Sequence, residues 1–436
     1  MRDIALFGLV FGLVPFILFK PYLGVLTYVW LSVMNPHRLT WGYAYDFGFA
    51  VVVGAATLIG ALLTKRRNPV PVNSLSIALG VFLVWTSITT ILALYPGESF
   101  EKWVVMIKTL FIVMMIPVLL ETREQFRMLI WVIVLSLAYY GTKGGLFVLM
   151  TGGEFRVWGP DGSYIQDNNA LAAALVMTVP MMRYLQLTSP HRIVRLGLLV
   201  MMLLCAIAVF GSYSRGALLA VSAMLAFLWL KGRHKLAFVV VAAVSIPLVL
   251  SVMPAQWYQR METIGEYQLD SSANMRLNSW GTMLNIAKDR PILGAGYEVA
   301  KKEVYNRYSP DPSFPPQVAH SIYFEALGSH GFVGLGIYIA LLFCHWRTAG
   351  NIVRKAGNRP DLAWAKHYGL MMQVSIVGFA VGGAFLSIML FDVPYYLIGV
   401  TLVASRLVDE QLEVTEQVAR TASAPVPVVS ARQPSA

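Results

Sequence analysis

The sequence predicts an all-α membrane protein with about 12 transmembrane helices and one long extracytoplasmic loop. The chain has 436 residues, of which 57% are hydrophobic and only 13% are charged, whereas a soluble domain carries about 25% charged residues. Apolar runs of about 18 to 25 residues recur from end to end, and each is long enough to cross a bilayer as a helix. The runs show no period-two alternation, which excludes a membrane β-barrel and leaves helices to satisfy the backbone in lipid.

The apolar runs give the expected spans in order along the chain. They cover residues 4–34, 46–63, 74–94, 103–120, 128–150, 168–187, 193–211, 216–230, 236–253, 319–346, 366–389 and 391–407. The first run allows two interpretations, because Lys20-Pro21 interrupts it. It forms either one long kinked span, or two short ones that give about 13 spans and put the N-terminus outside.

Five of the connections are rich in lysine and arginine. If each run spans once, all five lie on one side of the membrane, and such loops are retained in the cytoplasm. The formal net charge of +11 therefore reflects topology, and we do not infer a nucleic-acid partner from it. The basic connections lie at 65–67, 123–127, 191–195, 231–235 and 347–359.

These patterns divide the chain into four parts. Transmembrane helices fill 1–253, a polar loop follows at 254–319, further transmembrane helices occupy 320–408, and 409–436 is a charged, partly disordered cytoplasmic tail. The loop holds seven Lys or Arg and seven Asp or Glu, so it has no positive bias. A polar connection of this length is usually functional, and we expect it to form an extracytoplasmic lid.

Within the loop, residues 274–289 have helical spacing, with Leu277, Trp280, Leu284 and Ala287 on one face. The proline-rich stretch 307–316 predicts an irregular flap that leads to His320. The two cysteines, Cys205 and Cys344, lie in apolar runs and show no metal-site spacing. We expect no cofactor and no metal.

Two candidate site residues stand at the outer ends of spans. His320 precedes a span, and an imidazole can take a proton from a hydroxyl near neutral pH; the alternative is a histidine that caps the helix. Arg215 lies in the turn Gly-Ser-Tyr-Ser-Arg215-Gly between two apolar runs. Arginine at membrane depth is costly and usually paired or functional, although it can also extend its side chain towards the interface.

Two further arginines flank the expected helix of the loop. Arg276 falls in its first turn, where a cation opposes the helix dipole and so suggests an anionic partner. Arg290 lies at its C-terminal end, where a cation is favoured in any case. At the start of the span from 168, Asp167 or Asn168 is expected to cap the helix.

The predicted topology brings Arg215, Arg276, Arg290 and His320 to the same membrane face. Guanidinium groups are suited to binding pyrophosphate, which is a good leaving group once its charge is neutralised. Such a set of residues predicts a site that binds a phosphorylated lipid and deprotonates an acceptor.

The motifs at these positions resemble those of the O-antigen ligase and polymerase superfamily. They are Ser-Tyr-Ser-Arg215-Gly-Ala, Met275-Arg276-Leu-Asn-Ser-Trp280 with Arg290-Pro-Ile-Leu-Gly-Ala-Gly296, and His320-Ser-Ile-Tyr-Phe-Glu with Gly331 and Gly334. The resemblance covers roughly residues 160–400, and the stretch from Asn35 to Tyr45 resembles a branch of O-glycosylation ligases.

The resemblance implies a metal-independent, inverting glycosyltransferase of the GT-C type in the bacterial inner membrane. It would transfer an O-antigen glycan from undecaprenyl pyrophosphate to a lipid A–core sugar at the periplasmic face, as an O-antigen ligase does in lipopolysaccharide biosynthesis. His320 would be the base, Arg215 and Arg276 would hold the donor pyrophosphate, and Arg290 would assist. Alternatives are an O-antigen polymerase, a protein O-oligosaccharyltransferase, and a transporter of a lipid or solute.

Overall fold

The computed structural model describes residues 1–65, 67–232, 235–236, 240, 243, 247, 251, 253–262 and 271–422. Most of the expected span 236–253, residues 263–270 of the loop and the tail from 423 lie outside the described residues. The described residues form helices, turns and irregular segments without a β-strand. Together with its apolar helices, this confirms the prediction of an all-α polytopic membrane protein.

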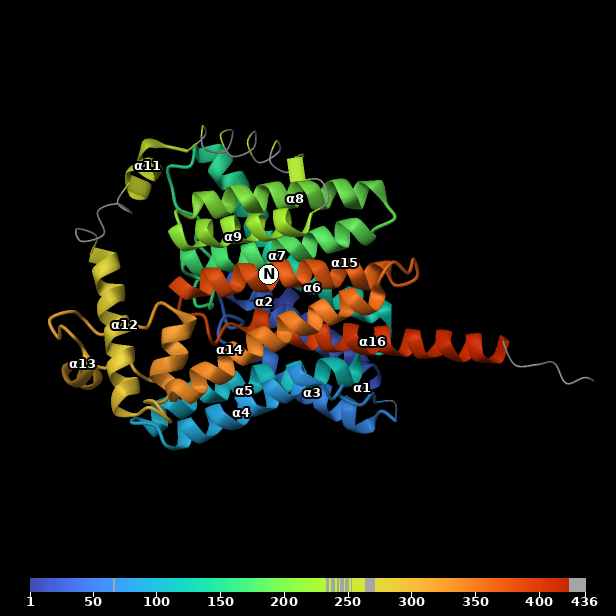
Figure 1. Ribbon diagram of the computed structural model, residues 1–436, viewed down its shortest axis with the longest axis horizontal. Coiled ribbons are helices and arrows are strands. Elements are labelled where there is room, and N and C mark those ends of the chain that lie inside the picture. The colour runs from blue at the N-terminus through green and yellow to red at the C-terminus, as the bar shows by residue number, and fades with distance from the viewer. Residues whose placement is uncertain are drawn as a thin grey trace, which may run out of the picture.

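Most of the helices run side by side along one axis (Figure 1). Eight in the described residues are long and apolar enough to cross a bilayer. They are α1 (Arg2–Phe19), α4 (Ser74–Ile91), α5 (Pro96–Leu119), α6 (Arg123–Thr151), α7 (Asn168–Thr188), α8 (Arg192–Gly211), α14 (Ile322–Ala356) and α15 (Ala363–Gly382). Shorter helices are α2 (Pro21–Met34), α3 (Phe49–Leu63) and α9 (Arg215–Lys231), while α16 (Asp392–Ala422) extends past the others (Figure 1).

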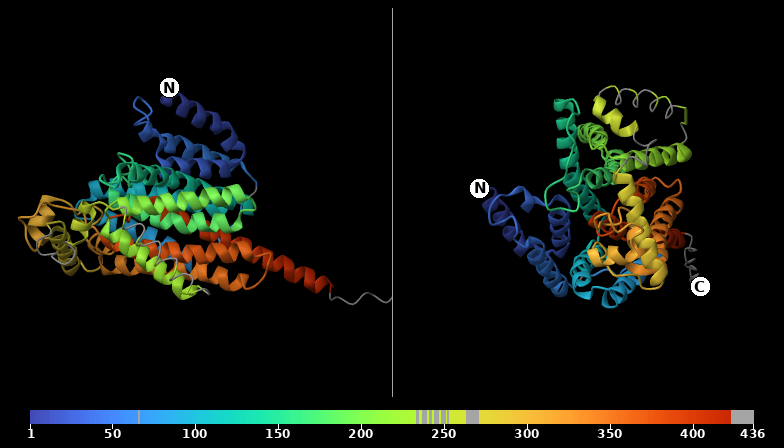
Figure 2. Two further views of the ribbon diagram at one scale, coloured as in Figure 1. Left: turned by 90° about the horizontal axis from the view of Figure 1, so that it is seen from above. Right: turned by 90° about the vertical axis from the view of Figure 1, so that its left-hand side faces the viewer.

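The first apolar run forms two short helices. α1 and α2 are separated at Lys20, and Arg2 at the start of α1 donates a hydrogen bond to the carbonyl of Leu39, which follows α2. The two helices are therefore antiparallel, as in the second of the two interpretations, and the N-terminus lies at the same end of the bundle as 35–45. With α3 they form a unit beside the main bundle (Figure 2).

The connections between helices separate by charge to the two ends of the bundle. At one end the basic connections meet: Asn68 donates to the Val118 carbonyl, and Arg406 donates to the carbonyls of Pro117 and Leu120. At the other end, Tyr213 donates to the Gly153 carbonyl and Arg290 to the Leu92 carbonyl. For these connections, the grouping in the fold is the one that the sequence predicted.

The described part of the polar loop covers this second end. It contains α11 (Ala255–Glu262), α12 (Ser271–Asp289) and α13 (Lys302–Tyr308), and α12 stands across the bundle end (Figures 1 and 2). The loop has a small core of its own, made by Met283, Ile286, Ala295, Val299, Val304, Tyr308 and Ala319. α12 and the flap 309–319 are called the lid below.

Three details of the lid differ from the sequence prediction. α12 already begins at Ser271, so Arg276 lies in its second turn and not in its first. Its buried face agrees with the expected one only in part: Ala287 is fully buried, as are Met283 and Ile286, whereas Leu277 is 48% exposed. α13 extends as far as Tyr308, so the irregular flap starts only after it.

The segment that follows α12, residues 290–296, is inserted into a break in α14. It is called the base of the lid. Gly331 has a left-handed backbone inside this helix, with φ of 72°, which frees carbonyl groups on the preceding turn. The carbonyls of Gly328 and Ser329 accept hydrogen bonds of 2.8 Å from the backbone N–H groups of Ala295 and Gly296. Since buried backbone groups need partners, these bonds fix the segment after α12 to the bundle.

Candidate active site

A cleft of about 280 Å³ opens between the lid and the bundle end. Its walls come from the connection between α6 and α7 with the first residues of α7, from the lid with His320 directly after it, and from the turn before α16. The residues that line it are Arg156, Trp158, Asp167, Asn168, Asn169, Ser272, Met275, Arg276, Gln317, His320 and Leu386. α7 begins at the cleft and is largely enclosed by other helices, because 83% of the residues in its apolar 18-residue stretch are buried.

Arg215 is the first residue of α9 and follows a tight turn. In that turn Tyr213 has a left-handed backbone, with φ of 58°, and its hydroxyl donates to the Gly153 carbonyl at 2.6 Å. Ser214 caps the helix by accepting from the Ala217 N–H. The turn therefore presents a guanidinium group at the N-terminal end of a helix, a combination that favours an anion.

Arg276 connects Arg215 to the cleft. Arg215 and Arg276 line one narrow pocket together with Asn169, Phe385 and Leu386, and Arg276 also lines the larger cleft with His320. The narrow pocket has a volume of about 10 Å³, which is room for about one water. An anionic group of a substrate would therefore lie on the cleft side of Arg276.

His320 is held in place through its own backbone and its neighbours. Its N–H donates to the Ser387 hydroxyl at 2.6 Å, and the carbonyl of Ala319 accepts from the Trp280 indole at 2.9 Å. The residue has a left-handed backbone, with φ of 48°, which is uncommon for residues other than glycine, although histidine adopts it more often than most. Ser321 provides the cap of α14, so helix capping is not the role of His320.

The surroundings of His320 favour a neutral imidazole. Burial lowers its pKa below the ordinary value, and the nearby Arg276 cation lowers it further, while Asp167 acts in the opposite direction. A neutral imidazole has an acceptor nitrogen. The side chain can therefore take up a proton from a hydroxyl group at neutral pH.

Arg290 lies away from these residues. It is 14 positions after Arg276, which corresponds to about 21 Å along a helix. Its guanidinium donates to the Leu92 carbonyl at 2.6 Å, and it lines neither the narrow pocket nor the cleft. The structure thus brings Arg215, Arg276 and His320 together and leaves Arg290 as a contact between the lid and α4.

Sequence reasoning missed the residues that the connection between α6 and α7 brings to the cleft. Arg156 adds a third guanidinium group, and Trp158 adds an exposed aromatic ring. Asp167 caps α7, as expected, by accepting from the N–H groups of Asn169 and Ala170. It also lines the cleft, which the capping pattern alone does not reveal. The signal that could have pointed to these residues is that 151–167 is polar and was expected on the outer side.

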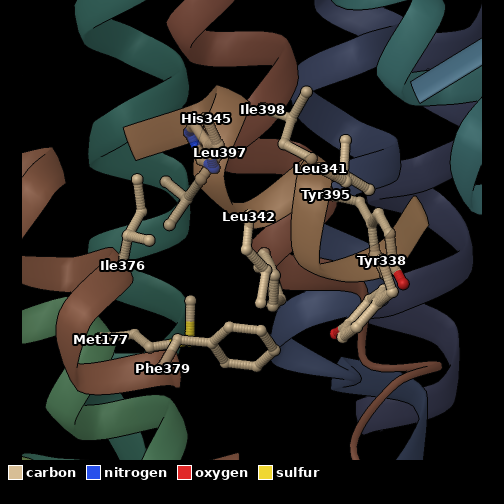
Figure 3. Close-up of a pocket in the computed structure, with 11 residues that line it drawn as sticks. Met177, Tyr338, Leu341, Leu342, His345, Ile376, Phe379, Tyr395, Leu397 and Ile398 are labelled. Carbon is tan, nitrogen blue, oxygen red and sulfur yellow. The ribbon is translucent and has the colours of Figure 1, made fainter. Parts of the chain in front are cut away.

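A second pocket lies inside the bundle and has a different character (Figure 3). It is lined mostly by apolar side chains, including Met177, Leu341 and Phe379, and has a volume of only about 20 Å³. The one histidine on its wall, His345, is paired with the Thr401 hydroxyl at 2.8 Å. This pocket is a packing defect between α7, α14, α15 and α16, with no group placed for catalysis.

Comparison with known families agrees with the location of the cleft. Residues 200–339 match the family described as O-antigen ligase. Residues 200–339 are called the O-antigen ligase domain below, after the family that they match. This domain contains Arg215, Arg276 and His320, and it confirms the resemblance to the O-antigen ligase and polymerase superfamily. No curated protein matches the chain.

The O-antigen ligase domain does not form the cleft alone. Residues 1–189 match a family of unknown function, DUF5935, and this region supplies Arg156, Trp158, Asp167 and Asn169. Leu386, from the turn before α16, lies outside both matches. The cleft is therefore shared by the O-antigen ligase domain, the region of unknown function and the C-terminal helices.

Proposed function

We propose that the protein transfers an O-antigen glycan from undecaprenyl pyrophosphate to a sugar hydroxyl of lipid A–core. The O-antigen ligase domain supports glycosyl transfer of the ligase or polymerase type. The observation that carries the proposal is the position of Arg276. It lies between Arg215 and His320, so one side chain borders both an anion site and a candidate base.

In the proposed reaction the donor pyrophosphate lies against Arg276 and Arg215, with Arg156 nearby. The acceptor hydroxyl gives its proton to the neutral imidazole of His320 while its oxygen attacks the anomeric carbon of the glycan. The anomeric C–O bond to pyrophosphate breaks, and undecaprenyl pyrophosphate leaves. The arginines stabilise the charge that develops on the leaving group, and attack from the opposite side inverts the anomeric configuration.

The proposed location is the inner membrane of a bacterium, with the cleft facing the periplasm. Basic connections are retained in the cytoplasm, and in the fold they gather at the end opposite the cleft. On this basis the cleft and the lid are extracytoplasmic. The lipid part of the donor remains in the bilayer beside the bundle, while its pyrophosphate reaches the cleft at the membrane surface.

A reconstituted reaction with three acceptors tests the proposal. The purified protein is supplied with undecaprenyl-pyrophosphate-linked glycan and with lipid A–core, a second lipid-linked glycan, or a protein that carries acceptor serines. We expect glycan to appear on lipid A–core. Transfer to the lipid-linked glycan would indicate a polymerase, and transfer to the protein would indicate an O-oligosaccharyltransferase. Movement of lipid across a vesicle membrane without glycan transfer would indicate a transporter.

A further inference from the structure

Trp158 exposes a large aromatic face inside a polar cleft. Its side chain is 57% exposed, and it lines the same cleft as Arg276 and His320. An apolar ring left in water is costly, and an aromatic group among a few polar ones is typical of a ligand site. The ring lies at the bundle end and borders the cleft, where a bound substrate can contact it.

The chain on both sides of Trp158 is fixed. The N–H of Val157 donates to the Gly211 carbonyl at 3.1 Å, and the N–H of Gly159 donates to the Gln166 carbonyl at 3.0 Å. A side chain at Gly159 would collide with the Ile165 carbonyl, because an added Cβ would lie 1.7 Å from that oxygen. The exposed ring is therefore carried by a braced segment and is preorganised for contact.

The groups around Trp158 match the chemistry of a sugar ring. A pyranose has an apolar C–H face, which stacks on an aromatic ring, and an edge of hydroxyl groups that need hydrogen-bond partners. Asp167 uses Oδ1 to cap α7, and a carboxylate has a second acceptor oxygen. Gln317 and Asn169 add amide groups to the same walls.

The two hollows differ in the groups that line them. Arg215 lines the narrow pocket, Trp158 and His320 line the cleft, and Arg276 borders both. Inversion requires the acceptor oxygen to approach from the side opposite the pyrophosphate, next to the base. A ring on Trp158 therefore belongs to the acceptor.

We propose that Trp158, with Asp167 and Gln317, forms the subsite for the acceptor sugar. This assigns a role to the part of the chain that matches a family of unknown function. The inference rests on the proposed function, since it takes the reaction to be glycan transfer onto a sugar hydroxyl. It adds that a sugar of the acceptor is recognised by stacking on the ring of Trp158.

The test varies Trp158 and measures the two substrates separately. Trp158→Ala should raise the KM for lipid A–core by about tenfold, the loss expected for an aromatic contact. The KM for the lipid-linked donor and the kcat should stay within about twofold. Trp158→Phe should restore most of the acceptor affinity. If Trp158→Ala does not fold, Trp158→Leu preserves apolar bulk without the ring and should show the same rise.

Phe155→Ala is the matched control. Phe155 lies three positions earlier, is 58% exposed and contacts Phe147, but it does not line the cleft. Its replacement should leave both KM values unchanged. An unchanged acceptor KM in Trp158→Ala, or a raised donor KM instead, would overturn the subsite while leaving the proposed function intact.

The choice of acceptor separates failure of the subsite from failure of the proposed function. If the wild type uses a second lipid-linked glycan, the same KM shift is expected for that acceptor, and only the ligase assignment is lost. If it uses a protein hydroxyl, or none of the three acceptors, both inferences are overturned, because no acceptor sugar would then lie on Trp158.

Discussion

At the scale of single residues, the proposed reaction depends on where Arg276 lies. One guanidinium group borders the narrow pocket with Arg215 and the cleft with His320. It also lowers the pKa of His320, in addition to the effect of burial. Arg276 therefore has two effects in the proposed reaction: it holds the leaving group, and it keeps the base neutral.

The pH dependence of transfer should reveal the state of His320. The base must be neutral, and its folded pKa lies below the ordinary value of 6.5. The rate should thus be constant around neutral pH and fall on acidification with a midpoint below 6.5. Asp167→Asn removes the one influence that raises this pKa, so the midpoint should move further down. A midpoint above 6.5 in the wild type would contradict the proposed role of His320.

The sequence could predict which connections lie at the same end of the bundle, but it could not predict the distances between their side chains. Arg290 was grouped with Arg276 because both flank the same expected helix and both were expected on the same side of the membrane. The sequence does not show that this helix stands across the bundle end, which separates the two side chains. Trp158 was missed for the opposite reason, since no local pattern links it to His320, which follows it by more than 150 positions.

At the scale of elements, the lid is positioned by its two ends. The segment after α12 is hydrogen-bonded into the break in α14. The flap is tied to α12 by Asn278, which donates to the Asp311 carbonyl, and to α13 by Tyr305, which donates to the Gln317 carbonyl. Because His320 follows the flap directly, these contacts set the position of the candidate base.

Gly294 should be the most sensitive position in the lid base. It has a left-handed backbone, and an added Cβ would lie 2.6 Å from the backbone nitrogens of His330 and Gly331. Gly294→Ala should lower the free energy of unfolding by about 2 kcal/mol or more and reduce transfer, because α12 and the flap would shift. Thermal unfolding in detergent and the transfer rate measure both effects.

Gly336→Ala supplies the control for that substitution. Gly336 lies in α14, and an added Cβ would meet nothing within 4 Å. Alanine is favoured over glycine in a helix by about 1 kcal/mol, so this variant should be as stable as the wild type or slightly more stable. A Gly294→Ala protein that behaves like Gly336→Ala would refute the anchoring role of the lid base.

The expected helix at 274–289 shows what periodicity can and cannot supply. The spacing identified a helix, and α12 is there. The buried face was chosen by hydrophobicity, which selected Leu277, yet the lid packs Ser279 and Thr282 inwards with Met283 and Ile286. Polar residues are tolerated there because they find partners: Ser279 and Thr282 donate to carbonyls one turn earlier.

At the scale of the whole molecule, charge separates the connections of the bundle into two sets. This organisation was predictable, because it follows from composition and from the rule that basic loops stay in the cytoplasm. What could not be predicted is that the cleft is assembled from distant parts of the chain. Segments near residues 158, 215, 276, 320 and 386 meet only in the folded bundle.

The shared construction of the cleft means that the O-antigen ligase domain would not be sufficient by itself. The domain supplies the proposed base and two arginines, while the region before it supplies a third arginine and the aromatic ring. On this account the chemistry belongs to the O-antigen ligase domain, and acceptor choice belongs to the region of unknown function.

The most direct measurement is glycan transfer to lipid A–core by single variants in a reconstituted system. His320→Ala should lose transfer by at least about a hundredfold, because the base is absent, while still binding the lipid-linked donor. Arg276→Ala should lose donor binding as well as transfer. Arg290→Ala, from the far end of the same helix, should keep both close to wild-type values. A folded His320→Ala protein that transfers glycan at the wild-type rate would contradict the account.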